Sequence, residues 1–257
     1  MRDNITAQKI LYDKKKLMNY MKRCERFTRL SSKYDDVEIA ENEDVIVMEE
    51  LDCTIRRIFN NNCVNDGGRF YGADYQRLSR EERSKIVINF EKTAELDYSA
   101  LHIRMLYHKK GIDYKEDPYS LPGYSEEFRP LIKKAVNIII NARSIVQAKE
   151  SLRKTIKEID LPIEIIRPSR FCNNLIREIE HYHQAIKEYF YSGYGLKLQR
   201  YDSDIALDIM KELTEKNILV LIVHDSFLVQ EYYVSDLKDA MIRHYKVKFN
   251  FDPVIKS

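Results

Sequence analysis

The stretch TAELDYSALHIRMLYH, residues 93–108, is the starting point for the fold of this chain. A run typical of a β-strand ends at Asp97, and a helical pattern follows with Leu101 and Met105 on one face. An aspartate at the exit of a strand is held in place by the backbone and suits a hard cation, which prefers oxygen ligands. The alternative is that Asp97 only caps the helix that follows.

A second stretch, ILVLIVHDSFLVQ at residues 218–230, carries another aspartate at the end of an apolar run. Two apolar segments flank His224-Asp225-Ser226, which predicts a tight β-hairpin with the polar triplet at its tip. A plain turn explains an Asp-Ser pair but gives no reason for a histidine in so apolar a hairpin. Aspartates at the tips of adjacent strands would hold two Mg²⁺ ions about 3.5–4 Å apart. We therefore predict a metal site formed by Asp97 and Asp225.

Apolar periodicity predicts the remaining elements of secondary structure. Helices are expected at 5–30, 43–61, 129–158, 169–191, 203–216 and 234–246. Short strands are expected at 85–89, 93–97, 218–223 and 227–230. A domain boundary is expected near residues 62–68, where Gly67-Gly68 follows an acidic helical segment.

Composition narrows the kinds of site that the chain can contain. The 257 residues include 43 Lys and Arg against 41 Asp and Glu, a net charge of +2. Only 7 residues are glycine, about 3% against a typical value of roughly 7%. None of them has the spacing of a Walker A or dinucleotide-binding loop. A nucleotide site in this chain must therefore work without a glycine-rich phosphate loop.

Charge is strongly segregated along this nearly neutral chain. Residues 9–29 and 128–157 are rich in Lys and Arg, whereas residues 35–52 hold many acids and no Lys or Arg. Each block is explained by a solvated helix face, and a basic block is equally explained by contact with a phosphate backbone.

Other candidate sites and a membrane location receive little support from the sequence. There is no apolar run long enough to span a membrane and no signal peptide, so we expect a cytoplasmic protein without a membrane partner. His181 and His183 lack partners at metal-ligand spacing, which favours a surface or core role. The sequence identifies no protein partner. The cysteines lack disulfide or zinc spacing and are expected to be reduced: Cys24, Cys53, Cys63 and Cys172.

The two aspartate stretches resemble motifs of family A DNA polymerases. Residues 97–104, DYSALHIR, are similar to motif A of that family, DYSQIELR. Residues 223–225, VHD, resemble motif C, VHDE, and the HDSF of residues 224–227 is similar to the form in phage-type single-subunit RNA polymerases. Gln199, Asp204 and Ile205 match the helix MQGTAADI of the family. Gly68-Arg69 with Gln76 is similar to the TGR and LQN segments that precede motif A.

Motif B resembles the family less closely. Arg129 and Lys133 have the RxxxK spacing of the fingers helix, and Asn137 and Asn141 extend the same polar stripe along an otherwise apolar helix. Such a stripe needs a polar partner, and an incoming triphosphate would be one. A shift of register by one residue would make Lys134 the phosphate ligand.

The resemblance implies an α+β fold, a right-hand polymerase palm with a small antiparallel sheet. It further implies helical fingers, reduced here, at about residues 110–195 within a palm region of residues 65–257. Residues 1–64 would form an N-terminal helical region. This region would serve as a minimal thumb, and its basic block at residues 9–29 would bind the phosphates of the duplex.

The resemblance also implies the chemistry of a template-directed DNA polymerase. Its cofactors would be two Mg²⁺ ions, with Mn²⁺ as an alternative, and its partners a DNA primer-template and deoxynucleoside triphosphates. The implied metal ligands and catalytic residues are Asp97, Asp225 and the carbonyl of Tyr98. The implied nucleotide-binding residues are Arg129, Lys133, Lys134, Asn137, Asn141 and His102. The implied primer-template contacts are Arg69, Gln199 and His224.

Two departures from the family leave alternatives open. His102 stands where the DNA polymerases carry the glutamate that crowds the ribose 2′ position, so the choice of sugar does not carry over. Ser226 replaces the glutamate that follows the second aspartate. The alternatives are an RNA polymerase or primase-like enzyme, a template-independent nucleotidyltransferase, and a catalytically idle palm that binds nucleic acid.

Overall fold

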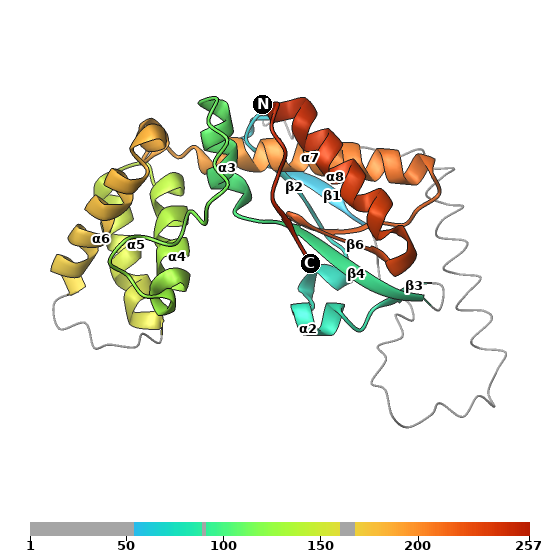
Figure 1. Cartoon of the computed structure of the whole chain (residues 1–257), viewed down its shortest axis with the longest axis horizontal. Helices are drawn as coiled ribbons and strands as arrows, with labels where there is room; N and C mark the ends of the chain where they lie inside the picture. The colour runs from blue at the N-terminus through green and yellow to red at the C-terminus, as the bar shows by residue number, and fades with distance from the viewer. Residues whose placement is uncertain (1–53, 89–90, 160–167) are drawn as a thin grey trace, which may run out of the picture. The chain divides into compact units, whose positions relative to one another are not determined.

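A computed structural model describes residues 54–88, 91–159 and 168–257 (Figure 1). The predicted helix at 5–30, most of the helix at 43–61 and the thumb-like region up to residue 53 lie outside these residues. Among the helices that the structure describes, none is both long and apolar enough to cross a membrane.

The chain divides into two compact units. The first contains residues up to Tyr98, then Ser203–His244 and Ile255–Ser257, and the second contains Ser99–Asp202 and Tyr245–Val254. The predicted division into residues 1–64 and 65–257, with an insertion at about 110–195, stays a prediction.

The first unit is built on a small antiparallel sheet with the strand order β3-β4-β6-β5, and β7 pairs with the end of β4. The chain is thus an α+β protein with a small antiparallel sheet, as the sequence predicted, and the predicted strands at 93–97 and 227–230 are confirmed. The sheet strands are β3 (Val87–Ile88), β4 (Glu91–Tyr98), β5 (Leu221–Val223), β6 (Ser226–Gln230) and β7 (Ile255–Lys256).

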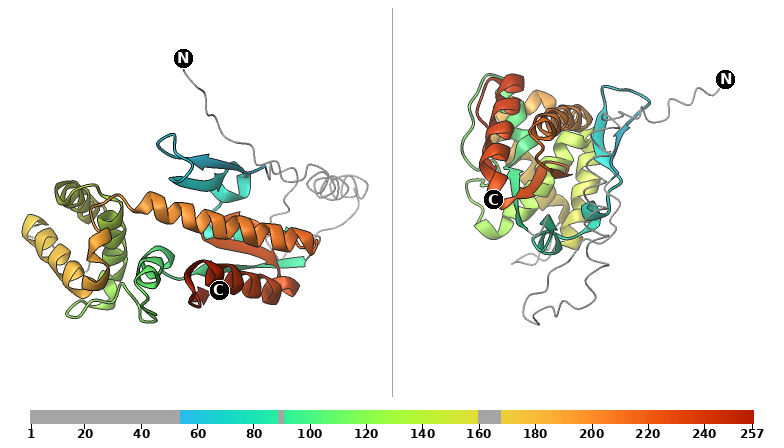
Figure 2. Two further views of the ribbon diagram at one scale, coloured as in Figure 1. Left: turned by 90° about the horizontal axis from the view of Figure 1, so that it is seen from above. Right: turned by 90° about the vertical axis from the view of Figure 1, so that its right-hand side faces the viewer.

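Two helices contribute to the core of the first unit, α7 (Gly195–Glu215) and α8 (Val234–Phe249). Figure 2 shows both running alongside strands β4 and β6. Side chains alternate across β4, so Leu96 and Tyr98 are buried while Asp97 is half-buried. The Tyr98 hydroxyl donates to the Met241 carbonyl of α8 over 2.7 Å. This contact fixes the end of β4, the strand that carries Asp97.

An ion cluster on Glu212 joins the parts of α7 and α8 that belong to the first unit. Arg243 donates to one Glu212 oxygen over 2.8 Å, His244 lies 2.9 Å from the other, and Lys216 lies 2.9 Å from the first. Partial burial acts to raise the pKa of Glu212, but the hydrogen bonds from these side chains outweigh it and hold the pKa at about 2.

The strands β1 (Arg56–Phe59) and β2 (Gly67–Tyr71) form a separate antiparallel hairpin, followed by the short helices η1 (Asp74–Arg77) and α2 (Arg80–Arg83). The predicted helix at 43–61 is therefore wrong at its described end. Asn61 and Asn62 both adopt positive φ angles, which suits the turn of a hairpin and ends any helix.

Arg57 of β1 is a buried cation of the first unit, with only 4% of the residue exposed. Its guanidinium donates to the Gly68 carbonyl over 2.7 Å and to Ser203 and Asp204 of α7 over 2.6 Å each. Gly68 has a φ of +89°, and a Cβ there would lie 3.1 Å from the Arg57 Nε atom. A glycine is needed here because the backbone passes so close to a buried arginine.

The second unit is helical. It contains α3 (Leu101–Lys109), the 3-10 helix η2 (Glu126–Phe128), α4 (Arg129–Asn141), α5 (Ile145–Glu158), α6 (Pro168–Tyr182) and the 3-10 helix η3 (Gln184–Tyr189), with the first part of α7.

The predicted helix at 129–158 is wrong as a single element, because it is broken between α4 and α5. Ala142 has an extended backbone, and Ser144 caps α5 by accepting a hydrogen bond from the Gln147 amide. The two short helices can therefore change direction and pack together, with Leu131, Ala135, Ala148 and Leu152 all buried.

The predicted helix at 169–191 is also interrupted, at His183. This histidine is fully buried, its Nε2 atom donates to the Pro118 carbonyl over 2.9 Å, and its Nδ1 atom lies 2.7 Å from the Tyr107 hydroxyl. Because a carbonyl can only accept, Nε2 carries the proton and Nδ1 accepts from the tyrosine. Burial lowers the pKa of His183 to about 4, so the ring stays neutral near pH 7. Of the surface or core role expected for His181 and His183, His183 takes the core role.

Candidate functional site

Of the two predicted catalytic aspartates, Asp97 lies near the end of β4 and Asp225 lies directly before the neighbouring strand β6, both in the first unit. In the β4–β6 ladder, Asp97 faces Ser226, the residue that follows Asp225. The Tyr98 amide donates to the Asp225 carbonyl over 3.3 Å, so the two aspartates are one step apart along the ladder. Paired strands run about 4.8 Å apart, and both aspartates are half-buried. The sheet therefore brings their backbones together at one end of its central strand pair.

Asp225 lies in a two-residue connection between β5 and β6, where Val223 pairs with Ser226. His224, the first residue of this connection, has a φ of 60°. A histidine tolerates the left-handed region better than most residues, but the conformation is uncommon and is kept only where surrounding contacts hold it. The hairpin predicted around His224-Asp225 is confirmed, and its tip is tightly constrained.

Residues of the β1–β2 hairpin and η1 support the connection that carries Asp225. The Gln76 side-chain amide donates to the Ile222 carbonyl over 2.9 Å and to the Phe70 carbonyl over 3.1 Å. The Ile222 amide donates to the Tyr75 hydroxyl over 3.3 Å. Gln76, which the sequence singled out by resemblance, therefore has a positioning role for strand β5.

His224 contacts the β1–β2 hairpin through Tyr71. Their rings meet edge to face with centroids 5.3 Å apart. Arg69 precedes Tyr71 by two residues on β2 and therefore projects from the same side of that strand. The predicted contact residues Arg69 and His224 thus belong to the same unit as the aspartate pair. Their role toward a primer-template stays a prediction.

The aspartate pair fits a small hard cation through the chemistry of its donors. Both side chains end in carboxylate oxygens, and both are half-buried, so water or substrate can reach them. Within the described ranges no group of three or more His, Cys, Asp or Glu residues could hold a metal ion. Mg²⁺ commonly binds through one or two carboxylates together with waters and substrate phosphates, so two carboxylates suffice for such a site.

The predicted nucleotide-binding residues lie in the second unit. Helix α4 buries Leu131, Ile132 and Val136. Its opposite face exposes the polar stripe of Lys133, Lys134, Asn137 and Asn141. The amphipathic pattern predicted for this helix is confirmed, and the binding role of the stripe stays a prediction.

Arg129 at the start of α4 has an acidic partner within its own unit. Its guanidinium donates to the two Asp117 carboxylate oxygens over 2.5 and 3.2 Å, and it lies 5.5 Å from the centroid of the Tyr119 ring. The bond to Asp117 raises the pKa of Arg129, against a smaller opposing effect of burial. A phosphate contact by Arg129 would have to compete with Asp117.

His102, at the predicted sugar-contact position on α3, pairs with Asp202 of α7. The Nε2 atom of His102 lies 2.7 Å from an Asp202 oxygen, and the Asp202 side chain is 1% exposed. Sequence reasoning did not find Asp202 or Arg57. Each pairs with a residue more than ninety positions away, His102 and Asp204 respectively, and no local spacing reveals such pairs. Gln199 is half-buried on α7, and its predicted role is untested.

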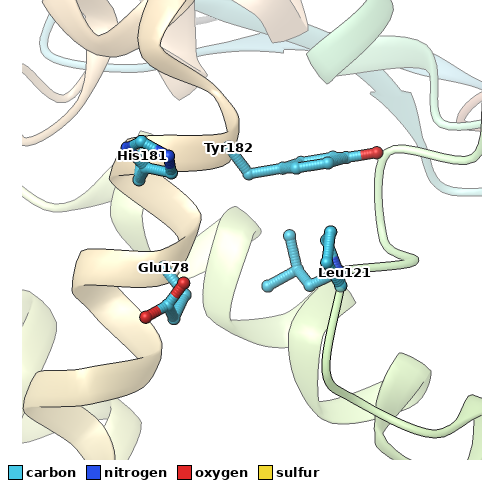
Figure 3. Close-up of a pocket in the computed structure, with 5 residues that line it drawn as sticks. Leu121, Glu178, His181 and Tyr182 are labelled. Carbon is cyan, nitrogen blue, oxygen red and sulfur yellow. The ribbon is translucent and has the colours of Figure 1, made fainter.

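A hollow of about 410 Å³ in the second unit contains none of the predicted site residues (Figure 3). Glu178, His181 and Tyr182 of α6 line it together with Leu121 and Pro122. His181 is exposed, as expected for a residue without metal-ligand spacing.

Comparison with known proteins gives a likeness to solved structures and none to a family or a curated sequence. No family model and no curated protein matches the chain. The solved structure of the POL domain of Pol1 from M. smegmatis, in complex with DNA primer-template and dNTP, is similar with a TM-score of 0.51 and 11% sequence identity. The match covers 76% of this chain and 45% of the other, so this chain spans less than half of that protein's length. The likeness shows a polymerase-like fold.

Proposed function

We propose that this chain is a nucleotidyltransferase that extends a DNA primer on a template, a reaction that uses two divalent metal ions. The observation that carries the proposal is the placement of Asp97 and Asp225 one ladder step apart at the end of the central strand pair of the sheet, in a chain with a polymerase-like fold. The proposal includes membership of the family A polymerases, which the sequence motifs suggest and the distant structural likeness supports only at the level of the fold.

In this proposal Asp97, Asp225 and the carbonyl of Tyr98 bind Mg²⁺, with Mn²⁺ as a substitute. When bound, the ions lower the pKa of the primer 3′-hydroxyl and neutralise charge on the transferred phosphate. The chain contributes rigid carboxylates. Tyr98 is anchored to Met241 and Asp225 sits in a two-residue connection, so neither aspartate depends on a long loop for its position.

The exposed stripe of α4 would take the triphosphate in this proposal. Lys133 and Lys134 are exposed, and neither forms an ion pair within the part of the chain that the structure describes, so their charge is available to an anion. Arg129 would join them by exchanging Asp117 for phosphate. Asn137 and Asn141 would complete the stripe, although the Asn141 side chain already donates to the Asn137 carbonyl over 2.8 Å.

The remaining assignments concern the nucleic acid and the sugar. His224 would contact the primer terminus, and Arg69 and Gln199 the minor groove of the primer-template. His102 would lie against the sugar of the incoming deoxynucleoside triphosphate, with its ring held by Asp202 over 2.7 Å. A ring held in this way has one orientation, which is what discrimination between sugars requires.

Primer extension with purified variants tests the proposal. Asp97→Asn and Asp225→Asn preserve size and hydrogen bonding but remove the charge, and each should reduce the rate by about 10³-fold, or about 4 kcal/mol of transition-state stabilisation. Asp239→Asn changes an exposed aspartate of α8 and should leave the rate unchanged. Equal extension by the wild type and both site variants would exclude these residues as catalytic.

A second experiment separates the proposed reaction from its alternatives. All eight nucleotides are offered with and without a template, and products are analysed by length. Incorporation of deoxynucleotides only with a template supports the proposal. Ribonucleotide incorporation would indicate an RNA polymerase or primase-like enzyme. Incorporation without a template would indicate a template-independent nucleotidyltransferase, and the absence of any incorporation would indicate a catalytically idle palm that binds nucleic acid.

A further inference from the structure

A basic hollow lies between α5 and the start of α6, in the second unit. It has a volume of about 540 Å³ and is lined by Glu150, Arg153, Lys154, Lys157 and Ser169. Four of these residues belong to α5, and Ser169 lies in the first turn of α6. None of the residues assigned above to the proposed transfer reaction lines this hollow.

Helical spacing explains why the three cations gather on one side of α5. Arg153 and Lys157 are one turn apart, about 6 Å along the axis, and Lys154 lies beside them. The opposite side of the helix buries Ala148, Leu152 and Ile156. Burial raises the pKa of the Cys172 thiol on α6, and Arg153 acts against this rise, which places the Arg153 charge near α6.

The charges of these three cations are not neutralised by ion pairs with acidic side chains of the described residues. In the described ranges of the chain, Arg153, Lys154 and Lys157 form no ion pair, and all three are exposed. Other exposed lysines of the same unit do form ion pairs, such as Lys110 with Glu188 and Lys187 with Glu180, at 3.0 Å each. Among the described residues that line the hollow, Glu150 is the one acid, so three positive charges face one negative charge there.

The ligand that fits this hollow carries phosphate groups, with uncharged groups between them that can lie beside Glu150. Cations on one helix turn bind phosphate oxygens well. A free triphosphate concentrates its charge and would meet Glu150, whereas a nucleic-acid strand has one charge per nucleotide and can place a sugar or base edge beside that carboxylate. A rigid duplex cannot enter a hollow of about 540 Å³, but one nucleotide of a flexible strand can.

An exposed apolar residue continues the same face toward the start of α5. Val146 is 61% exposed and precedes Arg153 by seven residues, which places it on the same side of the helix. An apolar side chain next to cations suits a strand that offers sugars and bases as well as phosphates.

We infer that the basic hollow formed by Arg153, Lys154, Lys157 and Ser169 binds the phosphate backbone of single-stranded nucleic acid. This inference goes beyond the proposed transfer reaction, because binding here needs neither the aspartate pair nor a divalent metal.

Fluorescence anisotropy with a labelled 20-nucleotide oligothymidylate, without metal or nucleotide, tests the inference on the full chain. The triple variant R153Q/K154Q/K157Q should bind about tenfold or more weakly at moderate salt. The slope of log affinity against log salt should fall by about 2, since each lost phosphate contact on a single strand contributes about 0.7. Glutamine keeps the helix propensity of the replaced residues.

The matched control is K92Q/R177Q/K238Q, which removes the same charge from three exposed residues on β4, α6 and α8. It should retain the wild-type affinity and salt slope. Equal losses in both triple variants would overturn the inference, because net charge alone would then explain binding. It would also be overturned if free triphosphate competed as well as unlabelled single strand at equal phosphate concentration.

The binding measurement distinguishes this inference from the proposed function. The double variant D97N/D225N should bind the oligonucleotide like the wild type while failing to extend a primer. If the wild type extends no primer but the basic-hollow variant alone loses strand binding, the transfer reaction is wrong and the inference stands. If primers are extended but the basic-hollow variant binds like the wild type, the inference is wrong and the transfer reaction stands.

Discussion

Arg57 in the first unit and Arg153 in the second show two opposite uses of the same side chain. Arg57 is buried, and each of its hydrogen bonds ends on a residue of its own unit, Gly68, Ser203 or Asp204. Arg153 is exposed and lines a hollow together with two lysines. A buried cation whose hydrogen bonds are all made within the fold contributes to the free energy of unfolding. A cation that faces solvent beside like charges contributes little to that free energy, so its charge is available to a ligand. Glu212, partly buried among exposed cations, lies between these extremes.

The largest effect on stability is expected for Arg57→Ala. The substitution leaves the carboxylate of Asp204 without its 2.6 Å partner, and removal of one member of a buried pair costs about 3–5 kcal/mol. Urea unfolding of the purified variant measures the loss of unfolding free energy. Arg56→Ala, on the exposed side of the same strand, serves as control and should cost less than about 0.5 kcal/mol. Equal losses of unfolding free energy in Arg57→Ala and Arg56→Ala would show that the buried arginine stabilises the fold no more than the exposed one.

An intermediate effect is expected for Glu212→Gln, about 1–2 kcal/mol, because it removes charge-assisted hydrogen bonds from Arg243 and His244 at a partly exposed position. The folded-state pKa of Glu212 is about 2, below its ordinary value. Its contribution is therefore fully present above about pH 4.5 and is lost as the pH falls toward 2. The difference in unfolding free energy between wild type and variant should shrink over that range.

The control for this second prediction is Glu215→Gln, which changes an exposed glutamate three residues further along α7. Its effect on stability should be small and independent of pH. A wild-type advantage over Glu212→Gln that persisted undiminished at pH 2 would contradict the proposed role of the ionised carboxylate.

The smallest effect is expected for R153Q/K154Q/K157Q, whose unfolding free energy should differ from that of the wild type by less than about 0.5 kcal/mol. Thermal unfolding followed by circular dichroism measures it. A loss of several kcal/mol would show that these cations stabilise the fold, and any loss of strand binding would then have a structural explanation. Unchanged stability, combined with weakened binding, would sharpen the contrast with Arg57.

Local sequence patterns were sufficient for the strands that carry the aspartates. The β-like run before Asp97 and the two apolar runs that flank His224-Asp225 have the lengths and composition typical of strands, and the structure confirms these strands. The β5–β6 hairpin could therefore be predicted from local signals. The pairing of β4 with β6 joins Thr93–Asp97 to Ser226–Gln230, far apart in the sequence, and was implied only by the resemblance to the polymerase family.

The β1–β2 hairpin lies in a stretch for which apolar spacing predicts a helix and the turn residues predict a hairpin. The apolar spacing of Ile55, Ile58 and Phe59 is compatible with a helix, whereas the Asn-rich segment before Gly67-Gly68 is typical of a hairpin turn. The break between α4 and α5 had a similar signal, since Ser144 precedes Gln147 at capping-box spacing. In both cases the turn and cap residues, and not the apolar periodicity, determined the secondary structure.

The pairs that complete the candidate site could not be predicted from local patterns. Asp202 reaches His102 and Asp204 reaches Arg57 across 100 and 147 positions, respectively. Only tertiary packing brings such residues together. For the same reason the partner of Arg129, Asp117, was not anticipated, although it determines how readily that arginine can meet a phosphate.

The two-residue connection between Val223 and Ser226 also constrains how this chain can vary. Because the side chains of β6 alternate between faces, one inserted residue would exchange those faces, and Phe227 and Leu228, both 1% exposed, would each have to pack on the side that the other now fills. We therefore expect natural variants and selected libraries to change the residue type at position 224 but to conserve the length of this connection. In an insertion scan along the chain, insertions between Val223 and Ser226 should be among the least tolerated. Single substitutions at neighbouring positions should be accepted.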